Sequence, residues 1–197
     1  METKIPVEVS ARHIHLSKED LEKLFGLGYE LKELKRLSQP SDFACEETVD
    51  IKVGDKEIKN VRVVGPLREK TQVEISKTDA FILGVNPPIM LSGEIENSSP
   101  VVIVGPEETL SLKEGLIVAL RHIHCATSQA AELGLKNNDK VSVRVPASPS
   151  QGGDGERPVI FENVAIRIKD DYKLCMHLDT DEGNAAGIDK IGNGAIL

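Results

Sequence analysis

Alternating apolar and polar positions predict a series of short β-strands along most of the chain. Residues 5–10, IPVEVS, are rich in β-branched side chains, and residues 47–64 alternate on both sides of a Gly54–Asp55 turn. A period of two places one set of side chains on a buried face, and a glycine turn between two such runs predicts a β-hairpin. Similar runs follow at residues 61–76, 99–112, 114–124, 139–146 and 158–168. We therefore expect a mainly β fold of the barrel type.

Helical periodicity is confined to a few short stretches, which we expect to cap the barrel. Residues 17–26 begin with Ser17, a suitable N-cap, and carry an apolar stripe that includes Leu21 and Leu24. Residues 30–36, ELKELKR, predict a second short helix.

A third short helix is predicted near the middle of the chain. Residues 127–135, TSQAAELGL, have Thr127 or Ser128 as the cap and Gly134 as the stop. Further on, residues 147–157, ASPSQGGDGER, are rich in Gly, Ser and Pro, which predicts a mobile surface loop between two strands.

The tetrapeptide RHIH occurs at residues 12–15 and again at residues 121–124, and the two copies hold four of the five histidines. Side chains at positions i and i+2 of a strand share a face, so the two imidazoles of each copy point the same way. Two imidazoles at that spacing can chelate one borderline metal ion such as zinc. A single His-x-His is weak evidence, because histidines also occupy hydrogen-bonded positions on half-buried strands. Its repetition favours metal binding.

A catalytic zinc ion usually takes three protein ligands and leaves one position open, so two such ions need two further ligands. His177 is the remaining histidine, and Glu74 in TQVEIS is a strand carboxylate that could complete the set. Taken alone, Glu74 would be interpreted as a solvated strand carboxylate. The cysteines have no C-x-x-C spacing, and we expect them to be packing residues: Cys45, Cys125 and Cys175.

Three arginines raise the question of an anionic substrate. Arg12 and Arg121 precede the two histidine pairs and should point to the opposite face of the strand. Arg68 follows a Gly-Pro turn and lies six residues before Glu74. A fixed guanidinium near a metal site suits a phosphate or carboxylate group, although the spacing of Arg68 fits a surface charge equally well.

Composition narrows the classes of function. The 197 residues suit one large domain or two small ones, with 40% hydrophobic, 28% charged and 3% aromatic residues. The net charge of −8 argues against a surface for nucleic acid or anionic membrane, because these partners need a basic footprint. Three unpatterned cysteines indicate reduced thiols in a cytosolic protein. No apolar run reaches 18 residues, so no membrane span is predicted.

Four segments together resemble a known family. VEVSARHIHLS at residues 7–17, GPLREKTQVEIS and the following TDA, LG and NPP at 65–88, SG at 92–93, and ALRHIH with A and LGL at 119–135 are similar to the PduL-type phosphate propanoyltransferases, or phosphotransacylases. The resemblance extends from residue 6 to about residue 190. Its motifs are specific because they occur in the right order with the right separations.

The resemblance implies a set of site residues and substrates. Two zinc ions would be held by six ligands, namely His13, His15, Glu74, His122, His124 and His177. Arg68 matches the arginine that holds phosphate. Four further positions match residues that contact coenzyme A, namely Ser10, Lys35, Arg62 and Asn184.

The resemblance also implies an architecture and a location. Two β-barrel-like domains capped by short helices would comprise residues 1–11 with 120–197 and residues 12–119, with the active site at their interface. Members bound for bacterial microcompartments carry an N-terminal amphipathic extension, and none is visible here. We therefore expect a cytoplasmic enzyme, and we expect a homodimer.

The function implied is reversible transfer of a short acyl group between coenzyme A and phosphate. Acyl-CoA, either propanoyl-CoA or acetyl-CoA, and phosphate would give acyl phosphate and CoA by direct attack at a di-zinc site. Two alternatives are open, and the first of them uses the same ligands. One is a di-metal hydrolase of acyl-CoA or an ester, with metal-bound hydroxide as nucleophile. The other is a non-enzymatic metal-binding module with closed four-ligand sites.

Overall fold

The computed structural model describes residues 3–146 and 158–197, so the predicted loop at residues 147–157 lies outside the described residues. The chain forms two compact units. Unit 1 combines Met1–Ala11 with Leu120–Leu197, and unit 2 is Arg12–Ala119. No helix in the described ranges has the length and apolar character that crossing a membrane requires.

In its described residues, unit 1 is a closed barrel of six strands with two short helices. Around the barrel the strands run in the order β1, β13, β10, β12, β11 and β14, and β14 pairs with β1 to close it. The elements are β1 (Thr3–Val9), β10 (His122–Cys125), α3 (Thr127–Leu133), β11 (Lys140–Val145), β12 (Val159–Ile168), β13 (Cys175–Leu178), α4 (Thr180–Ala185) and β14 (Ile191–Ile196).

Unit 2 contains a second six-stranded barrel, which closes because β8 pairs with both β4 and β9. Its order is β4, β5, β2, β6, β9 and β8, and two short strands, β3 and β7, extend the sheet. The elements are β2 (His13–His15), α1 (Lys18–Phe25), β3 (Glu33–Arg36), β4 (Phe43–Val53), β5 (Lys56–Gly65), β6 (Gln72–Ile75), α2 (Lys77–Leu83), β7 (Ile89–Met90), β8 (Ser99–Val104) and β9 (Thr109–Ala119).

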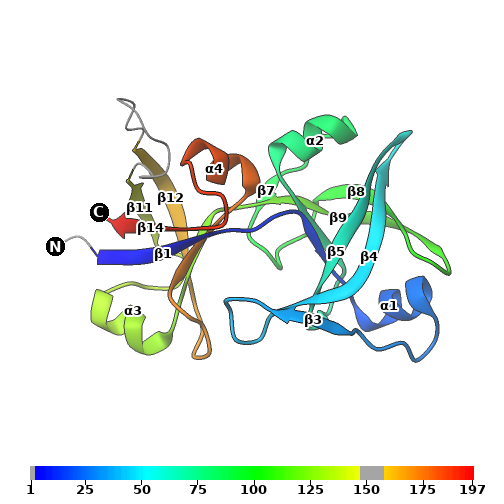
Figure 1. Cartoon of the computed structure of the whole chain (residues 1–197), viewed down its shortest axis with the longest axis horizontal. Helices are drawn as coiled ribbons and strands as arrows, with labels where there is room; N and C mark the ends of the chain where they lie inside the picture. The colour runs from blue at the N-terminus through cyan, green and yellow to red at the C-terminus, as the bar shows by residue number, and fades with distance from the viewer. Residues whose placement is uncertain (1–2, 147–157) are drawn as a thin grey trace. The chain divides into compact units, whose positions relative to one another are not determined.

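The two barrels have the same pattern of strand directions. In each, the His-x-His strand is parallel to one neighbour and antiparallel to the other: β2 to β5 and β6, β10 to β12 and β13. In both barrels the antiparallel neighbour is itself parallel to the next strand, β6 to β9 in unit 2 and β13 to β1 in unit 1. Asn60 and Asn163 hold matching left-handed positions with φ 56°. In Figure 1, the two helices of each unit lie on opposite sides of its strands.

In each barrel, one strand directly precedes a histidine pair that lies in the other barrel. β1 directly precedes the first RHIH, yet it belongs to the unit 1 barrel, where it pairs with β13 and β14. β9 directly precedes the second RHIH, yet it pairs with β6 and β8 of unit 2. The strand in front of each histidine pair therefore completes the other barrel.

Aliphatic side chains fill both barrels, as the low aromatic content requires. Ile14 and Ile123, the residues between the paired histidines, are each 0% exposed and belong to the separate cores of units 2 and 1. Because side chains alternate along a strand, burial of these isoleucines turns the imidazoles on either side to the opposite face. The hydrophobic cores thus orient the histidines.

The structure confirms the mainly β class, the two barrels and the short helices. It also confirms the hairpin at Gly54–Asp55 and the N-cap Ser17, whose hydroxyl accepts from the Asp20 backbone N–H. The helix predicted at residues 30–36 is wrong, because residues 33–36 of this segment form β3 and pair with β4. A sheet edge that offers backbone partners outweighs the weak helical propensity of so short a stretch.

The predicted cap of the third helix is also wrong. Helix α3 starts at Thr127, and its N-cap position is Ala126, with no side-chain cap bond. Its end at Gly134, in the left-handed conformation, agrees with the sequence prediction.

We expect Ile123→Ala to lower the free energy of unfolding by about 2–5 kcal/mol, because it deletes a fully buried side chain and leaves a cavity. Ile160→Ala is the matched control, since Ile160 lies on β12 of the same unit and is 54% exposed. Urea unfolding followed by circular dichroism measures both. An equal loss in the two variants would contradict the role of Ile123 in the core.

Candidate active site

The first donor group lies on two adjacent strands of unit 2. His13 and His15 project from β2, and the antiparallel register places Glu74 of β6 directly opposite His13 and Gln72 opposite His15. Residues directly opposite in an antiparallel pair point to the same face. Ligand atoms of His13, His15 and Glu74 all lie within 4.8 Å of one another.

Hydrogen bonding fixes which nitrogen of His15 faces this group. The His15 Nδ1 lies 2.9 Å from the backbone oxygen of Val64. A carbonyl oxygen only accepts, so Nδ1 carries the proton and Nε2 keeps a lone pair. That Nε2 lies 4.0 Å from Glu74 Oε1, and the Nε2 of His13 lies 3.7 Å from Glu74 Oε2.

The charges of the first group suit a cation. Burial holds the pKa of His15 well below its usual value, and the neighbouring His13 and Arg68 act in the same direction, which favours the neutral imidazole that binds metals. Burial raises the pKa of Glu74, but the attraction of His13 and His15 and the hydrogen bond from Ser92 outweigh it and lower that pKa to about 2. Glu74 is therefore an ionised carboxylate buried among imidazoles.

The second donor group has the same layout in unit 1. His122 and His124 project from β10, and His177 of β13 lies directly opposite His122, as Glu74 lies opposite His13. The Nε2 atoms of His122 and His124 are 2.7 Å apart, and ligand atoms of all three histidines lie within 4.8 Å of one another. The His122 Nδ1 donates to the Leu120 backbone oxygen at 2.9 Å, so its Nε2 faces the group.

Stacking holds the second group in place. The His124 ring stacks on Tyr172 with centroids 4.2 Å apart and on His177 at 4.7 Å. Imidazole and carboxylate donors in sets of three are those of catalytic zinc sites, where two histidines with one glutamate or three histidines leave a position for substrate. Both groups thus fit a zinc ion by the chemistry of their donors.

Arg68 is connected to the first group by a chain of hydrogen bonds. Its Nη1 donates to the Ser92 hydroxyl at 2.8 Å, and that hydroxyl donates to Glu74 Oε1 at 2.7 Å. Gln72 Nε2 donates to both Glu74 Oε1 and Ser92 Oγ, at 2.5 and 3.0 Å, and its Oε1 accepts from the Gly93 backbone N–H. The half-buried guanidinium of Arg68 is therefore linked to Glu74 through Ser92.

Arg68 also lines a hollow on the surface of unit 2. Side chains of both charges surround it, and its lining residues are Arg68, Glu69, Lys70, Gln72, Met90, Gly93, Glu94, Ile95, Glu96 and Asn97. Two of the lining residues, Arg68 and Gln72, also belong to the hydrogen-bond chain that reaches Glu74.

The two arginines of the RHIH motifs serve a different purpose. Arg12 pairs with Asp79, and Arg121 Nη1 donates to Glu182 Oε1 at 2.6 Å. Asp79 and Glu182 occupy the same position, three residues past the N-cap, in the capping boxes of α2 and α4. Each of these helices follows the strand that carries the third ligand. The two ion pairs therefore tie each His-x-His strand to the helix beyond its third ligand.

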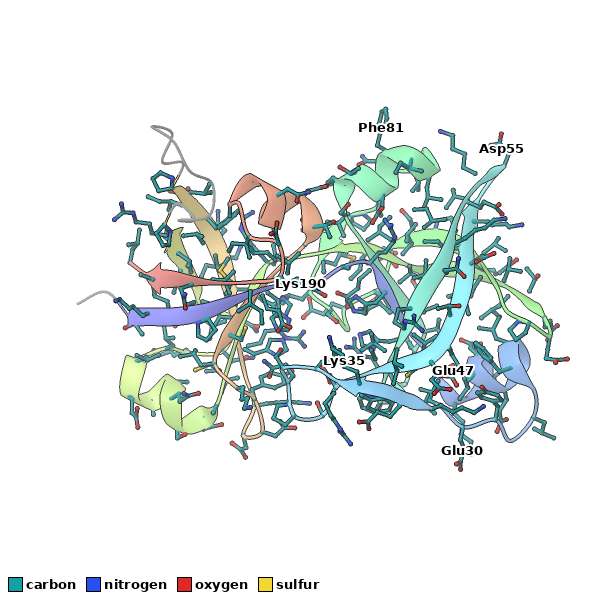
Figure 2. All side chains as sticks on the ribbon, viewed as in Figure 1. Glu30, Lys35, Glu47, Asp55, Phe81 and Lys190 are labelled. Carbon is teal, nitrogen blue, oxygen red and sulfur yellow. The ribbon has the colours of Figure 1, made fainter. Side chains whose placement is uncertain are left out.

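The four positions matched to coenzyme A divide between the units. In unit 2, Lys35 on β3 has an exposed side chain (Figure 2), and Arg62 on β5 donates to the carbonyls of Cys45 and Glu46 on β4. Lys35 pairs with Ala44 of the same strand β4, so the structure brings these two cations to one region.

The other two matched positions lie in unit 1. Ser10 follows β1, and its backbone N–H donates to the Leu178 oxygen at 2.8 Å. Asn184 is exposed on α4, whose helix packs against β1 and β13. Both therefore lie close to the strand that carries His177.

The cysteines are packing residues, as the sequence predicts. All three are buried, and burial raises the pKa of Cys45 to about 11 and that of Cys175 to about 12. A buried neutral thiol is a poor nucleophile and a poor metal ligand.

Sequence reasoning missed Ser92 and Gln72 as members of the site. Gln72 carries a usable signal, because it is two residues before Glu74 and must share its face of the strand. Ser92 carries no spacing signal, since it reaches Glu74 from a loop 18 residues away, and in the sequence it stands out only as part of the SG segment of the family resemblance.

Comparison with known proteins shows the family of this chain. The family model for phosphate propanoyltransferase matches residues 6–189, a span that includes both donor groups and Arg68. The chain belongs to this family. A member of that name from Thermotoga maritima is 51% identical over 186 residues, which are 94% of this chain and 85% of the relative.

Two further relatives carry the same name. The Salmonella typhimurium protein is 48% identical over 94% of this chain and 84% of its own length. The Listeria monocytogenes protein is 41% identical over 100% of this chain and 89% of its own length. The name denotes a transferase, so the family and enzyme class predicted from the sequence are confirmed.

We expect Arg121→Gln to lower the free energy of unfolding by about 1–3 kcal/mol, because it leaves the half-buried Glu182 carboxylate without its charged donor. Arg144→Gln is the control, since Arg144 lies exposed on β11 of the same unit. Thermal and urea unfolding measure both variants. If the two variants lose equal stability, the Arg121 pair does not hold β10 in place.

Proposed function

We propose that this protein is a phosphate acyltransferase that interconverts a short-chain acyl-CoA and phosphate with acyl phosphate and CoA. The observation that carries the proposal is the family match, which spans both donor groups and the arginine beside them. Propanoyl-CoA and acetyl-CoA are both candidates, because they differ by one methylene, which a pocket discriminates by only about 1–3 kcal/mol.

We further assign two zinc ions to the protein. His13, His15 and Glu74 would hold one, and His122, His124 and His177 would hold the other. When bound, zinc supplies Lewis-acid polarisation of a carbonyl or phosphoryl oxygen and favours a thiolate over a thiol.

The described residues supply binding and orientation. Arg68 is fixed by Ser92, and a guanidinium held in this way can bind phosphate by charge-assisted hydrogen bonds. A held phosphate oxygen attacks the thioester carbon, the carbon–sulfur bond breaks, and CoA leaves as its thiolate. Ser10, Lys35, Arg62 and Asn184 are the assigned contacts of CoA, and the two cations among them offset the charge of its phosphates.

Direct attack without an acyl-enzyme fits the chemistry of the cysteines. All three are buried, and burial raises the pKa of each thiol, so none is poised as a nucleophile. Their reduced state also fits the cytoplasm as the place of action. Formation of a homodimer stays a prediction.

The assay that tests this function follows free CoA. We expect CoA release from propanoyl-CoA or acetyl-CoA that requires phosphate, is abolished by a chelator and returns with zinc, because the donor groups need the ion and the reaction needs the second substrate. Acyl phosphate, trapped with hydroxylamine, should form in the same amount as CoA.

The two alternatives give different results. Release of CoA without phosphate would identify a di-metal hydrolase. Protein that binds two metal ions but releases no CoA under any of these conditions would be a metal-binding module, and the transferase proposal would be wrong.

Arg68→Lys should raise the KM for phosphate and leave the KM for acyl-CoA nearly unchanged, because a lysine cannot reproduce the fork of guanidinium donors. The loss of a charge-assisted contact predicts a fall of about 10- to 150-fold in kcat/KM for phosphate. Arg144→Lys, at an exposed position of unit 1, is the control. Equal changes in the KM of both substrates would contradict a phosphate-specific role for Arg68.

A further inference from the structure

Glu8 carries a carboxylate at the edge of the donor group of unit 1. It lies on β1, and the parallel register of β1 and β13 places it directly beside His177. Glu8 Oε2 is 3.6 Å from His177 Nε2, and ligand atoms of Glu8, Cys175 and His177 lie within 4.8 Å of one another. Glu8 lies within the segment VEVSARHIHLS that resembles the family, but neither the resemblance nor the function proposed above gives it a role.

The same place in unit 2 is occupied by an apolar residue. There β9 runs parallel to β6, and Ile117 stands beside Glu74 as Glu8 stands beside His177. Ile117 is 0% exposed, whereas the side chain of Glu8 is 27% exposed. The two positions thus correspond in topology and register but differ in chemistry.

Because of this difference, each donor group has one carboxylate, but at a different position. In unit 2 the acid is the third ligand, Glu74, and the position beside it is Ile117. In unit 1 the third ligand is His177, and the position beside it is Glu8. A group of three neutral imidazoles offers no charge to a divalent ion, whereas a carboxylate at Glu8 supplies the same single negative charge that Glu74 supplies in unit 2.

We propose that Glu8 is a fourth protein ligand of the metal ion held by His122, His124 and His177. Two ligands of a tetrahedral zinc ion at about 2.0–2.2 Å from the metal lie roughly 3.3 Å from each other. The 3.6 Å between Glu8 Oε2 and His177 Nε2 is close to that separation, so these two atoms can contact one ion. Glu8 shares a ligand group with His177 and Cys175, so its carboxylate must still turn toward His122 and His124 to share their ion. The proposal rests on the two metal sites assigned above.

A fourth ligand distinguishes the two ions. The ion of unit 1 has four protein donors, and the ion of unit 2 has three and keeps a position for a substrate atom. We therefore expect the unit 1 ion to be the more tightly bound of the two and the last to leave when the protein is treated with a chelator.

The experiment measures binding of zinc and cobalt to the full-length protein without assaying its activity. Metal-free wild type, Glu8→Gln, Glu8→Asp and His122→Ala are titrated against a chromophoric chelator to give the affinity of each ion. Glu132→Gln is the matched control, because Glu132 is an exposed carboxylate on α3 of the same unit. Thermal unfolding of each metal-free variant shows that the fold is kept.

We expect Glu8→Gln to lower the affinity for the more tightly bound ion by about 10- to 100-fold and to leave the affinity for the other ion unchanged. The visible absorption of bound cobalt should also fall, because water replaces the ligand. Glu8→Asp should recover part of the affinity, and Glu132→Gln should match wild type. Two ions bound to Glu8→Gln with wild-type affinities and an unchanged cobalt spectrum would overturn the proposal. An intense near-ultraviolet thiolate-to-cobalt band would assign the fourth position to Cys175 and would also overturn it.

His122→Ala separates this inference from the assignment on which it rests. If wild type binds two ions and His122→Ala binds one, the unit 1 site exists, and the Glu8 variants then decide the role of Glu8 alone. If wild type and His122→Ala bind the same number of ions, the metal assignment in unit 1 fails, and the role of Glu8 fails with it.

Discussion

Both donor groups depend on the antiparallel pairing of two short strands. Each His-x-His strand has only three or four residues, and its antiparallel neighbour brings the third ligand directly opposite the first histidine. A slip of one residue would turn that ligand to the other face and the isoleucine between the histidines out of the core. Burial of Ile14 and Ile123 therefore sets the geometry of the ligands as well as the stability of the barrels.

Two kinds of contact around the donor groups stabilise that register. Carbonyl oxygens of Val64 and Leu120 hold the Nδ1 atoms of one histidine in each group, which leaves Nε2 for a ligand. The arginines that begin the motifs bind the capping-box carboxylates of α2 and α4, so each helix is tied to the His-x-His strand that neighbours the strand before the helix. The identical arrangement in both units explains why the four letters RHIH recur as a block, because the arginine belongs to the support and the histidines to the site.

The sequence predicts the faces of the strands better than their partners. A period of two shows that His13 with His15 and His122 with His124 share a face, and the count of histidines leads to His177 and Glu74. Pairing between strands far apart in the chain is a tertiary property, so the exchange of β1 and β9 between barrels leaves no local signal. Residues 30–36 have a helical pattern, but the backbone of β4 gives them a sheet edge to join. Ser92 and the carboxylate partners of Arg12 and Arg121 come from loops and helix ends whose approach no spacing rule predicts.

The strand exchange also sets an order on folding during synthesis. Unit 2 is one continuous segment, so all six of its barrel strands have been made once β9 leaves the ribosome. Unit 1 needs its first strand from the opposite end of the chain, and β1 must wait for β13 and β14 before its backbone finds partners. Contacts between such distant segments carry a large loop-closure entropy and form late. The alternating strand β1 thus waits for its partners through most of translation, and β14, which is made after the other strands of this barrel, closes the barrel that carries the second histidine pair.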